Sequence, residues 1–333
     1  MTQIKSAPAR VGARIMGIGA YRPFRVVTND EIAPLIDSSD EWIQQRTGIQ
    51  TRRFASEHET LDEMAALAAA EALADAGVKP EQIGVVLVAT LTNPVQFPAV
   101  APTVAAKLGI PDPGAFDIGA ACAGFVYALS TAADMVKSGS VEYALVIGAE
   151  RMTDVLDFTD RGSAFIFGDG AGAMVVGPAD FNGFGPIIFG SDGSQADAIS
   201  MTSTWFDFRS GKAPAPPTLR MAGQQVFRWA VSEMVGVAQR AITAAGLEPK
   251  DLAAFVPHQA NNRITDAIVK ALDFPDTVAV ARDIRDSGNT TAATVPLALH
   301  ALRSEGRAPA GAPALLLGFG AGLTYAAQVV ALP

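Results

Sequence analysis

The sequence has 333 residues, 49% of them apolar and 18% charged, and a formal net charge of −9. This composition is typical of a globular protein and excludes a disordered chain. The acidic balance argues against nucleic-acid binding, because phosphate contacts require a basic face. The single cysteine, Cys122, can form no internal disulfide, and no cysteine cluster exists to hold a metal. We therefore expect a packed α/β protein in a reducing cytoplasm, without a bound metal.

Both ends of the chain carry apolar stretches that predict strands. Near the N-terminus, a short loose tail leads into a first strand at about residues 13–18, and the Gly-broken apolar run is a poor signal peptide. Residues 313–333 carry no charge and are about long enough to span a bilayer. Because Gly318, Gly320 and Gly322 interrupt this segment, it instead predicts two buried strands joined by a turn, and no membrane association.

Two helices are expected between these ends. Residues 63–77 combine Ala and Leu with acidic residues on one side and a closing glycine, which is typical of an amphipathic helix. Residues 122–139 predict a second helix whose first residue is the only cysteine. Apolar runs of strand length alternate with such helical segments, which favours an α/β fold.

An internal repeat organises the chain. Three pairs of segments recur in the same order at offsets of 169, 169 and 170 residues: 76–88 with 245–257, 117–125 with 286–294, and 144–148 with 314–318. One such match could arise by chance, but three in the same order indicate duplication. We therefore predict two similar halves, residues 1–180 and 181–333, whose two sheets sandwich shared helices.

Cys122 lies where an apolar strand turns into a helix. The unpaired N–H groups and the positive dipole end of that helix are expected to lower the thiol pKa and favour the thiolate. The alternative is a buried structural cysteine, which is the commonest role of a single cysteine.

His258 and Asn289 occupy comparable positions in the second half. His258 directly follows an apolar strand, and the repeat makes Ala89 its counterpart. Asn289 stands two residues before the predicted counterpart of Cys122, although an Asn in such a turn is often only a cap. His258 could also be a satisfied core histidine. His58 and His300 are assigned no role, since they fit a solvated loop and a helix surface.

A thiol, an imidazole and an amide allow two kinds of chemistry. A Cys-His-Asn set occurs in papain-like proteases, where Asn orients His. Alternatively, Cys carries an acyl group while His and Asn donate hydrogen bonds to a thioester oxygen and stabilise an enolate formed by loss of CO₂. Each well-aimed donor of this kind lowers the activation free energy by on the order of 3 kcal/mol.

Six segments extend over essentially the whole chain and read DSSDEWIQQRTGI, DIGAACAGF, DRGSAFIFGDGAGA, VPHQANNRI, SGNTTAATVP and GFGAGLTYA. Together they resemble one enzyme family, β-ketoacyl-acyl carrier protein synthase III. The resemblance implies a thiolase fold, five-layered and built from two duplicated halves, and a homodimer. It implies no cofactor, since acyl-CoA is a substrate, and malonyl-acyl carrier protein as the second substrate.

The resemblance also implies roles for the residues of the reaction centre. Cys122 matches the nucleophile that accepts the acyl group, and His258 and Asn289 match the pair that promotes decarboxylation of the malonyl group. The backbone N–H groups of Cys122 and Ala321 would form the oxyanion hole. The family usually has Gly at the position of Ala321 and Trp at that of Tyr325, which affects local backbone shape more than chemistry.

Further residues match sites for the two substrates. Trp42 and Arg161 match residues that sandwich the CoA adenine, Arg46 matches another CoA contact, and Asn261 lies near the pantetheine arm by the same resemblance. Residues implied to bind the carrier protein are Arg228, Gln259, Ala260, Asn261, Asn262, Arg263 and Lys270. The cations among them would supply the basic patch that an acidic carrier requires on a negatively charged enzyme, although they could equally be scattered solvated charges.

Phe97 matches a residue that reaches across the dimer to close the acyl pocket. Its bulky ring favours a short primer such as acetyl-CoA, although branched primers remain open. The main alternative function is a starter-unit acyltransferase or synthase of secondary metabolism on the same fold. Thiolase itself would need a second cysteine, elongating synthases use two histidines, and an inactive scaffold would not need Cys122, His258 and Asn289 together.

Overall fold

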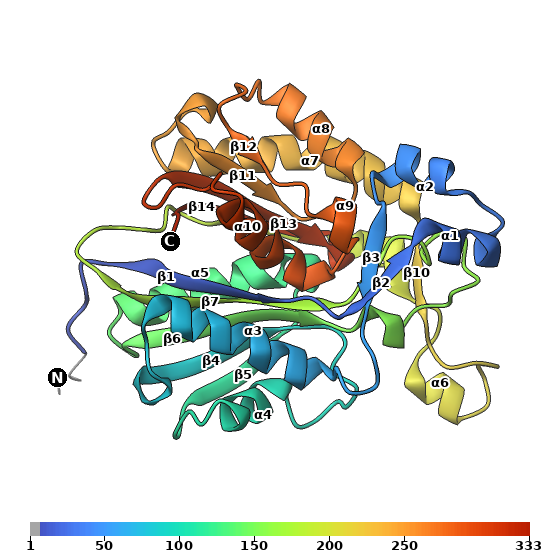
Figure 1. The fold of residues 1–333 in the computed structure, drawn as a ribbon, viewed down its shortest axis with the longest axis horizontal. Helices are drawn as coiled ribbons and strands as arrows, with labels where there is room; N and C mark the ends of the chain where they lie inside the picture. The colour runs from blue at the N-terminus through green and yellow to red at the C-terminus, as the bar shows by residue number, and fades with distance from the viewer. Residues whose placement is uncertain (1–6) are drawn as a thin grey trace.

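Each half of the chain builds a five-stranded mixed sheet (Figure 1). The computed structural model describes residues 7–333, so part of the expected N-terminal tail lies outside the described residues. The first sheet has the order β1-β7-β6-β4-β5, with bounds Gly12–Tyr21, Gly170–Ala179, Tyr143–Glu150, Ile83–Ala89 and Gly114–Ile118. The second has the order β12-β11-β13-β14-β8, with bounds Ala279–Val280, Ala254–Pro257, Pro313–Gly320, Thr324–Ala331 and Ile188–Gly190.

The pairing of the strands confirms the duplication. In the first sheet β4 pairs parallel with β6, and β6 pairs antiparallel with β7. In the second sheet β11 pairs parallel with β13, and β13 pairs antiparallel with β14. The strands β4 and β6 therefore correspond to β11 and β13. Val88 pairs with Ile147 in the first sheet, and Pro257 pairs with Leu317 in the second, which reproduces the offsets of 169 and 170. The division of the chain at residue 180 stays a prediction, although β7 ends before it and β8 begins after it.

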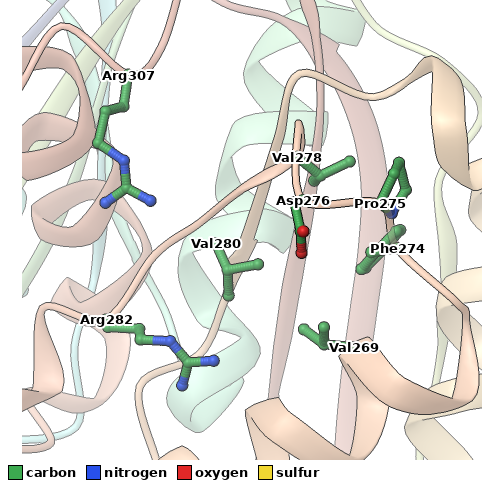
Figure 2. A pocket seen from close by; sticks show the side chains of 8 residues that line it. All are labelled: Val269, Phe274, Pro275, Asp276, Val278, Val280, Arg282 and Arg307. Carbon is green, nitrogen blue, oxygen red and sulfur yellow. The ribbon is translucent and has the colours of Figure 1, made fainter.

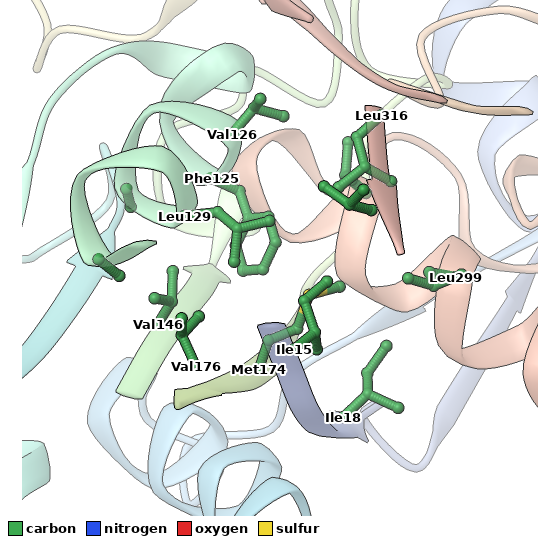
Figure 3. Packing of buried hydrophobic residues seen from close by; sticks show 14 of the residues in the cluster. Ile15, Ile18, Phe125, Val126, Leu129, Val146, Met174, Val176, Leu299 and Leu316 are labelled. Carbon is green, nitrogen blue, oxygen red and sulfur yellow. The ribbon is translucent and has the colours of Figure 1, made fainter. Parts of the chain in front are cut away.

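Helices cover both sheets and fill the space between them, which gives the five layers predicted from the resemblance (Figure 1). The middle layer contains α5 (Gly124–Lys137) and α10 (Thr294–Ser304), and their apolar side chains form one core with the inner faces of both sheets (Figure 3). The outer layers are α3 (Leu61–Ala76) with α4 (Val100–Lys107) on the first sheet, and α7 (Gly223–Ala244) with α8 (Asn262–Ala271) on the second.

Shorter elements border the layers and build the approach to the site. One group consists of the antiparallel strands β2 (Arg25–Thr28) and β3 (Thr51–Phe54), with α1 (Asn29–Ile32) and α2 (Asp40–Thr47) in the connection between them. A second antiparallel pair consists of β9 (Ile199–Met201) and β10 (Leu219–Met221), and the connection between them contains α6 (Trp205–Arg209). The four-residue helix α9 (Ile284–Ser287) precedes the turn that contains Asn289.

Most of the predicted elements are confirmed, with two corrections. The first strand, the Ala-rich helix and the two C-terminal strands are present as β1, α3, β13 and β14. The cysteine helix begins at Gly124 instead of Cys122. Asp117 and Asp286 are not equivalent, because Asp117 lies in β5 and caps α4 through the N–H groups of Val100 and Ala101, whereas Asp286 lies in α9. Within residues 7–333, no helix is long and apolar enough to cross a membrane.

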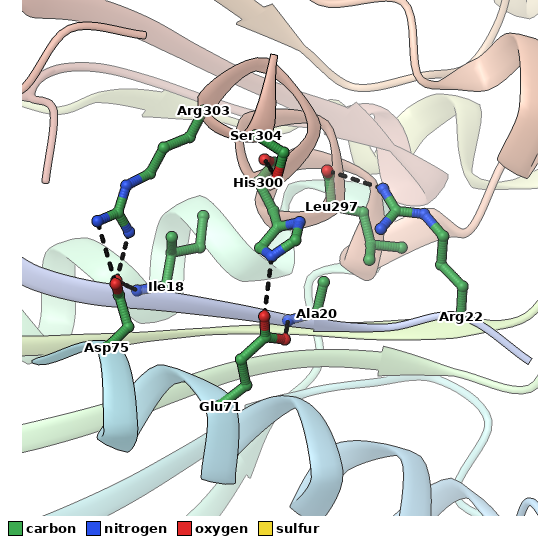
Figure 4. Close-up of polar contacts among 9 residues, drawn as sticks. All are labelled: Ile18, Ala20, Arg22, Glu71, Asp75, Leu297, His300, Arg303 and Ser304. Carbon is green, nitrogen blue, oxygen red and sulfur yellow. Dashed lines mark hydrogen bonds and ion pairs between the residues drawn. The ribbon is translucent and has the colours of Figure 1, made fainter. Parts of the chain in front are cut away.

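Ion pairs join the two halves along one side of the middle layer (Figure 4). His300 of α10 lies 3.2 Å from a Glu71 oxygen of α3, and Arg303 pairs with Asp75 one turn further on. The same two carboxylates accept backbone N–H groups of β1, the outer strand of the first sheet. These side chains therefore fix α10 against an edge strand that would otherwise expose its donors.

Candidate functional site

A pocket of about 600 Å³ brings the predicted reaction centre together. It lies where strand ends of the two sheets meet, and its walls are mostly apolar. The predicted residues Cys122, His258, Asn289 and Ala321 all line it. The other lining residues are Leu91, Thr92, Asn93, Pro94, Ala121, Met152, Asp154, Val155, Phe167, Ile199, Met201, Trp205, Leu219, Met221, Val226, Ala260, Thr291, Phe319 and Gly320.

Cys122 is held in a tight 3₁₀ turn, Ala121–Ala123, just before α5. The turn places Ala121 at a φ of 48°, an uncommon conformation for a residue with a side chain. Gly320 packs directly on the cysteine, since a Cβ there would lie 3.0 Å from Cys122 Sγ and 2.9 Å from its backbone N. Any larger residue would push the nucleophile out of place.

The expected lowering of the Cys122 pKa is wrong. Burial raises the pKa of this thiol, and the Glu150 carboxylate raises it further. The start of a helix favours the thiolate, but desolvation of the charged sulfur is the larger effect in this pocket. Cys122 is therefore a neutral thiol in the free protein, and it needs a base when it reacts.

His258 follows β11, and its ring is oriented by Thr294. Thr294 Oγ1 lies 2.7 Å from His258 Nδ1 and also donates to the Thr291 carbonyl oxygen at 2.8 Å. Because a carbonyl can only accept, the hydroxyl proton is used there, and Nδ1–H donates to Thr294. Burial lowers the pKa of His258 to about 3, so the ring is neutral and its Nε2 carries a lone pair. In the free protein His258 is thus a proton acceptor, and it becomes the expected donor only after it takes up a proton.

Asn289 is buried, and its amide has a defined orientation. Its Oδ1 accepts the Thr291 N–H at 2.8 Å, which leaves the two N–H groups of Nδ2 as donors for the pocket. The Asn289 backbone is fixed by hydrogen bonds with Ile166 and Gly168. This geometry favours hydrogen-bond donation to an oxygen in the pocket over the role of a simple turn residue.

The residues predicted to hold the CoA adenine form a cluster on α2 and its neighbours. The guanidinium carbons of Arg46 and Arg161 lie 5.4 and 5.5 Å from the centre of the Trp42 ring. Asn261 is the N-cap of α8 and donates to the Arg46 carbonyl oxygen at 2.9 Å. Asn261 therefore joins the second half to the Trp42 cluster, and it is Ala260 beside it that lines the pocket.

The predicted carrier-protein stretch divides into exposed and buried residues. Arg228, Arg263 and Lys270 are exposed on α7 and α8, and none of them forms an ion pair within residues 7–333. Asn262 is half-buried and accepts from Arg282. Gln259 is only 2% exposed and its amide bonds Pro257 and Ile284, so its predicted contact with a carrier protein is wrong.

Phe97 lies in the loop between β4 and α4, and its side chain is 82% exposed. It does not line the pocket of its own chain. The sequence resemblance placed this ring in the pocket of a second copy, and its exposure leaves it free for that role.

Three residues of the site were missed by sequence reasoning. Thr294 orients His258, Thr92 lines the pocket, and Glu150 acts on Cys122 from the end of β6. The run of hydroxyl residues after Asn289 and the single carboxylate that ends the apolar strand ALVIGAE were available signals. A second cleft of about 300 Å³ lies beside β12 (Figure 2), and its lining contains neither Cys122 nor His258.

Comparisons with known proteins identify the family of the chain. Residues 116–193 match the family 3-Oxoacyl-[acyl-carrier-protein (ACP)] synthase III, and residues 242–332 match its C-terminal part. Beta-ketoacyl-[acyl-carrier-protein] synthase III of Streptomyces glaucescens is 53% identical over 333 residues, with 100% of both chains covered.

Solved structures identify the same family and fold. The priming beta-ketosynthase from the R1128 polyketide biosynthetic pathway has a TM-score of 0.96 at 49% identity, with 98% of each chain covered. The 3-oxoacyl-[acyl-carrier-protein] synthase III of Aquifex aeolicus VF5 has a TM-score of 0.88 at 38% identity, with 96% of this chain and 100% of that chain covered. The chain thus belongs to the 3-oxoacyl-[acyl-carrier-protein] synthase III family of condensing acyltransferases, with the thiolase fold.

Proposed function

We propose that this enzyme condenses a short acyl-CoA with malonyl-acyl carrier protein and so starts a fatty acid chain. Acetyl-CoA is the proposed primer. The products are a 3-ketoacyl-acyl carrier protein, CoA and CO₂. The observation that carries the proposal is that Cys122, His258 and Asn289 line one pocket. Since His258 Nδ1 and Asn289 Oδ1 are engaged by Thr294 and Thr291, Nε2 and Nδ2 remain as a base and a hydrogen-bond donor for the nucleophile and its substrate.

In the first half-reaction Cys122 attacks the thioester carbonyl of the acyl-CoA. Its proton passes to His258 Nε2, which is the free lone pair of the neutral ring. The carbonyl oxygen becomes an oxyanion, and the backbone N–H groups of Cys122 and Ala321 are the proposed donors to it. When the intermediate collapses, the bond from carbonyl carbon to CoA sulfur breaks, and CoA leaves as the thiolate and then takes up a proton from solvent.

In the second half-reaction the malonyl group loses CO₂. The electron pair of the broken bond forms an enolate on the thioester oxygen, which Asn289 Nδ2 and the Nε2–H of protonated His258 stabilise by donation. The enolate carbon attacks the acyl carbonyl, and Cys122 leaves as the thiolate. It then recovers the proton from His258, so that the neutral thiol and the neutral ring are restored.

Both substrates are proposed to enter from the same side, because each carries a pantetheine arm. The Trp42 cluster and the start of α8 are joined by the Asn261 bond to Arg46, and Ala260 beside them lines the pocket. The CoA adenine would stack between Trp42 and Arg161. Arg228, Arg263 and Lys270 on the adjacent helices would attract an acidic carrier protein to the same entrance, despite the net charge of −9.

We also propose that the enzyme is a homodimer. The strand β5 is an outer strand of the first sheet, and Phe116 on it is 40% exposed. Three large apolar side chains in the neighbouring loop are also exposed, namely Leu91, Val95 and Phe97. An open strand edge with such side chains favours pairing with a second copy, whose pocket Phe97 would close.

The short primer can be tested through Phe97. Replacing Phe97→Thr removes the ring that would limit chain length, so we expect acylation by longer acyl-CoAs to increase relative to acetyl-CoA. Intact-protein mass spectrometry with a series of acyl-CoAs measures this ratio. An unchanged chain-length preference would contradict the assignment of Phe97 to the acyl pocket.

The whole reaction can be tested by mass spectrometry in two stages. The enzyme is incubated with acetyl-CoA and then with malonyl-acyl carrier protein, and wild type is compared with His258→Asn. We expect an acetyl group on Cys122 in wild type and acetoacetyl-acyl carrier protein only from wild type. Failure of wild type to carry an acyl group on Cys122 would overturn the proposal.

A second candidate is a starter-unit synthase of secondary metabolism. The match to the priming beta-ketosynthase of a polyketide pathway, at a TM-score of 0.96, is the observation that supports this second function. The two candidates share Cys122 chemistry and differ in the primer and the carrier protein. Competition between a fatty acid carrier protein and a polyketide carrier protein, both malonylated, distinguishes them by the faster condensation.

A further inference from the structure

Arg52 is a buried arginine that the proposed steps do not use. It lies in β3 and is 0% exposed. Burial lowers the pKa of its guanidinium to about 10, so the group is still charged at neutral pH. Burial of a charge is unfavourable for stability unless close partners compensate it. The partners of Arg52 therefore indicate why the charge is kept inside the protein.

The guanidinium has one strong contact. Among the ion pairs of residues 7–333 none includes Arg52. Its Nη2 donates to the Phe165 carbonyl oxygen at 2.6 Å, Nη1 makes a long contact of 3.5 Å with the Val27 carbonyl oxygen, and Nε has no partner in this part of the chain. A charged donor gives a stronger hydrogen bond than a neutral one. The main polar contact of Arg52 is thus the backbone at Phe165.

The stem of Arg52 packs against two glycines. A Cβ on Gly168 and a Cβ on Gly288 would each lie 3.1 Å from Arg52 Cβ. This is closer than the ordinary separation of two carbon atoms, so a side chain at either glycine would displace Arg52. Gly168 belongs to the first half of the chain and Gly288 to the second. Arg52 therefore packs where two backbone segments from opposite halves meet.

The same two segments hold the backbone of Asn289. Its N–H donates to the Ile166 carbonyl oxygen at 2.9 Å, and its carbonyl oxygen accepts the Gly168 N–H at 3.1 Å. Arg52 contacts the first and the last residue of segment 165–168, whereas Asn289 bonds the second and the last. One buried side chain is thus placed to fix the backbone from which the Asn289 amide is directed.

Other bonds attach the chain around Arg52 to the second half. The Gln50 N–H donates to the Arg285 carbonyl oxygen at 2.8 Å, and Thr51 Oγ1 donates to the Asp286 carbonyl oxygen at 3.1 Å. Neither bond uses the side chain of Arg52. A change confined to this side chain should therefore leave β3 in place and affect segment 165–168 first.

We propose that Arg52 is a positioning residue for decarboxylation: its guanidinium and its stem hold segment 165–168 against the backbone of Asn289, so that Nδ2 stays directed into the pocket. This inference rests on the proposed function of Asn289 as a donor to the enolate oxygen. Such donation depends on the direction of the N–H bond, and a small displacement of a reacting group has a large effect on rate. Arg52 acts only through the segment that it holds.

The test compares three variants. Arg52→Met keeps an apolar stem and removes every donor. Arg52→Lys keeps a charged donor that can reach toward the Phe165 carbonyl oxygen. The matched control is Gln328→Met, because Gln328 is also buried, donates to the Gly185 carbonyl oxygen at 2.8 Å and has one polar atom without a partner within residues 7–333, but it does not line the pocket.

Two steps are measured separately for each variant. Acylation of Cys122 is followed at saturating acyl-CoA, since the Phe165 ring packs against Trp42 and an effect on CoA binding must be removed. Release of CO₂ from malonyl-acyl carrier protein is followed with the acylated enzyme. We expect Arg52→Met to slow decarboxylation by about tenfold and to leave acylation at the wild-type rate, because acylation does not use Asn289.

The other variants separate positioning from stability. Arg52→Lys should recover most of the lost decarboxylation rate, because it restores a charged donor, and Gln328→Met should slow neither step. Equal slowing of acylation and decarboxylation in Arg52→Met would overturn the proposal. The same holds if Gln328→Met slows decarboxylation as much as Arg52→Met does, since that would indicate a general loss of stability.

Hydrogen exchange tests the same contact without a substrate. The backbone N–H groups of Asn289 and Gly168 report whether segment 165–168 stays bonded to the Asn289 turn. In wild type we expect both to exchange as slowly as those of β13, and in Arg52→Met at least about tenfold faster. Rapid exchange in wild type would overturn the proposal even if Arg52→Met does not fold. A wild type that releases no CO₂ would instead reject the proposed function, and it would leave the exchange rates unchanged.

Discussion

The two halves contain the same strand-to-helix turn, and only one of the two carries a nucleophile. The turns Ala121–Ala123 and Thr291–Ala293 are both 3₁₀, and both place their first residue at a φ of 48°. Each is followed directly by a helix of the middle layer, α5 or α10. Both halves thus have the same turn backbone, and it includes a conformation that costs energy in a residue with a side chain.

The side chains of the two turns differ in a way that separates the tasks. Cys122 corresponds to Ala292, Gly124 to Thr294 and Gly119 to Asn289, which makes the offset 170 here instead of the predicted 169. Each turn packs on a glycine of the opposite half: a Cβ on Gly318 would lie 3.1 Å from the Cys122 carbonyl oxygen, and one on Gly148 would lie 2.4 Å from that of Ala292. The comparison shows that one copy presents the nucleophile, while the other supplies the groups that serve it.

The largest effect is expected when the first turn is made like the second. Cys122→Ala should form no acyl-enzyme, and condensation should fall below about one thousandth of wild type. The double variant Cys122→Ala with Ala292→Cys should not recover, because Ala292 is buried and does not line the pocket. Intact-protein mass spectrometry after incubation with acyl-CoA measures both. Acylation of the cysteine at position 292 would show that the two turns are interchangeable.

Asn289 tests the supporting role of the second turn. Asn289→Asp keeps the acceptor for the Thr291 N–H but removes the donors of Nδ2, so decarboxylation should slow by about a hundredfold. Acylation of Cys122 should proceed as in wild type, since that step does not use Nδ2. The release of CO₂ and the rate of acylation are measured separately. An equal loss in both steps would contradict the division of tasks.

The pH dependence of stability tests the burial of His258, whose counterpart in the first half is Ala89. Burial lowers the pKa of His258 to about 3 from 6.5, so the unfolded chain binds more protons than the folded one between these values. Acidification in this window therefore favours unfolding. The free energy of unfolding should fall by about 2 kcal/mol more in wild type than in His258→Ala between pH 6.5 and 4.5. Urea titrations at both pH values measure it, and parallel losses would refute the assignment.

The smallest effect is expected at Thr294, which replaces Gly124 of the first turn. Thr294→Val removes the acceptor for His258 Nδ1–H and should lower condensation by about tenfold, which corresponds to one lost hydrogen bond. The control is Thr290→Val, because the buried hydroxyl of Thr290 has no hydrogen-bond partner within residues 7–333. The pH profile of kcat should change in Thr294→Val only. An equal effect of the two variants would indicate loss of packing.

Much of the fold could be predicted from the sequence because the signals that indicate its elements are local. Apolar runs, helix-ending glycines and repeat offsets are properties of consecutive residues, and they located β1, α3, β13 and β14 and the equivalence of the halves. The same reasoning misplaced Asp286, because α9 changes the connection after β12 in the second half without disturbing the strands around it.

For the site, the sequence by itself determined which residue types meet at strand ends: Cys122, His258 and Asn289 all line the pocket. The tertiary structure decided their protonation states. Burial of Cys122 outweighs the helix terminus, Thr294 directs the His258 proton away from the pocket, and Gln259 is withdrawn from the surface. Desolvation and hydrogen-bond direction depend on residues distant in the chain, such as Glu150 and Phe319, and the order of the amino acids does not encode them locally.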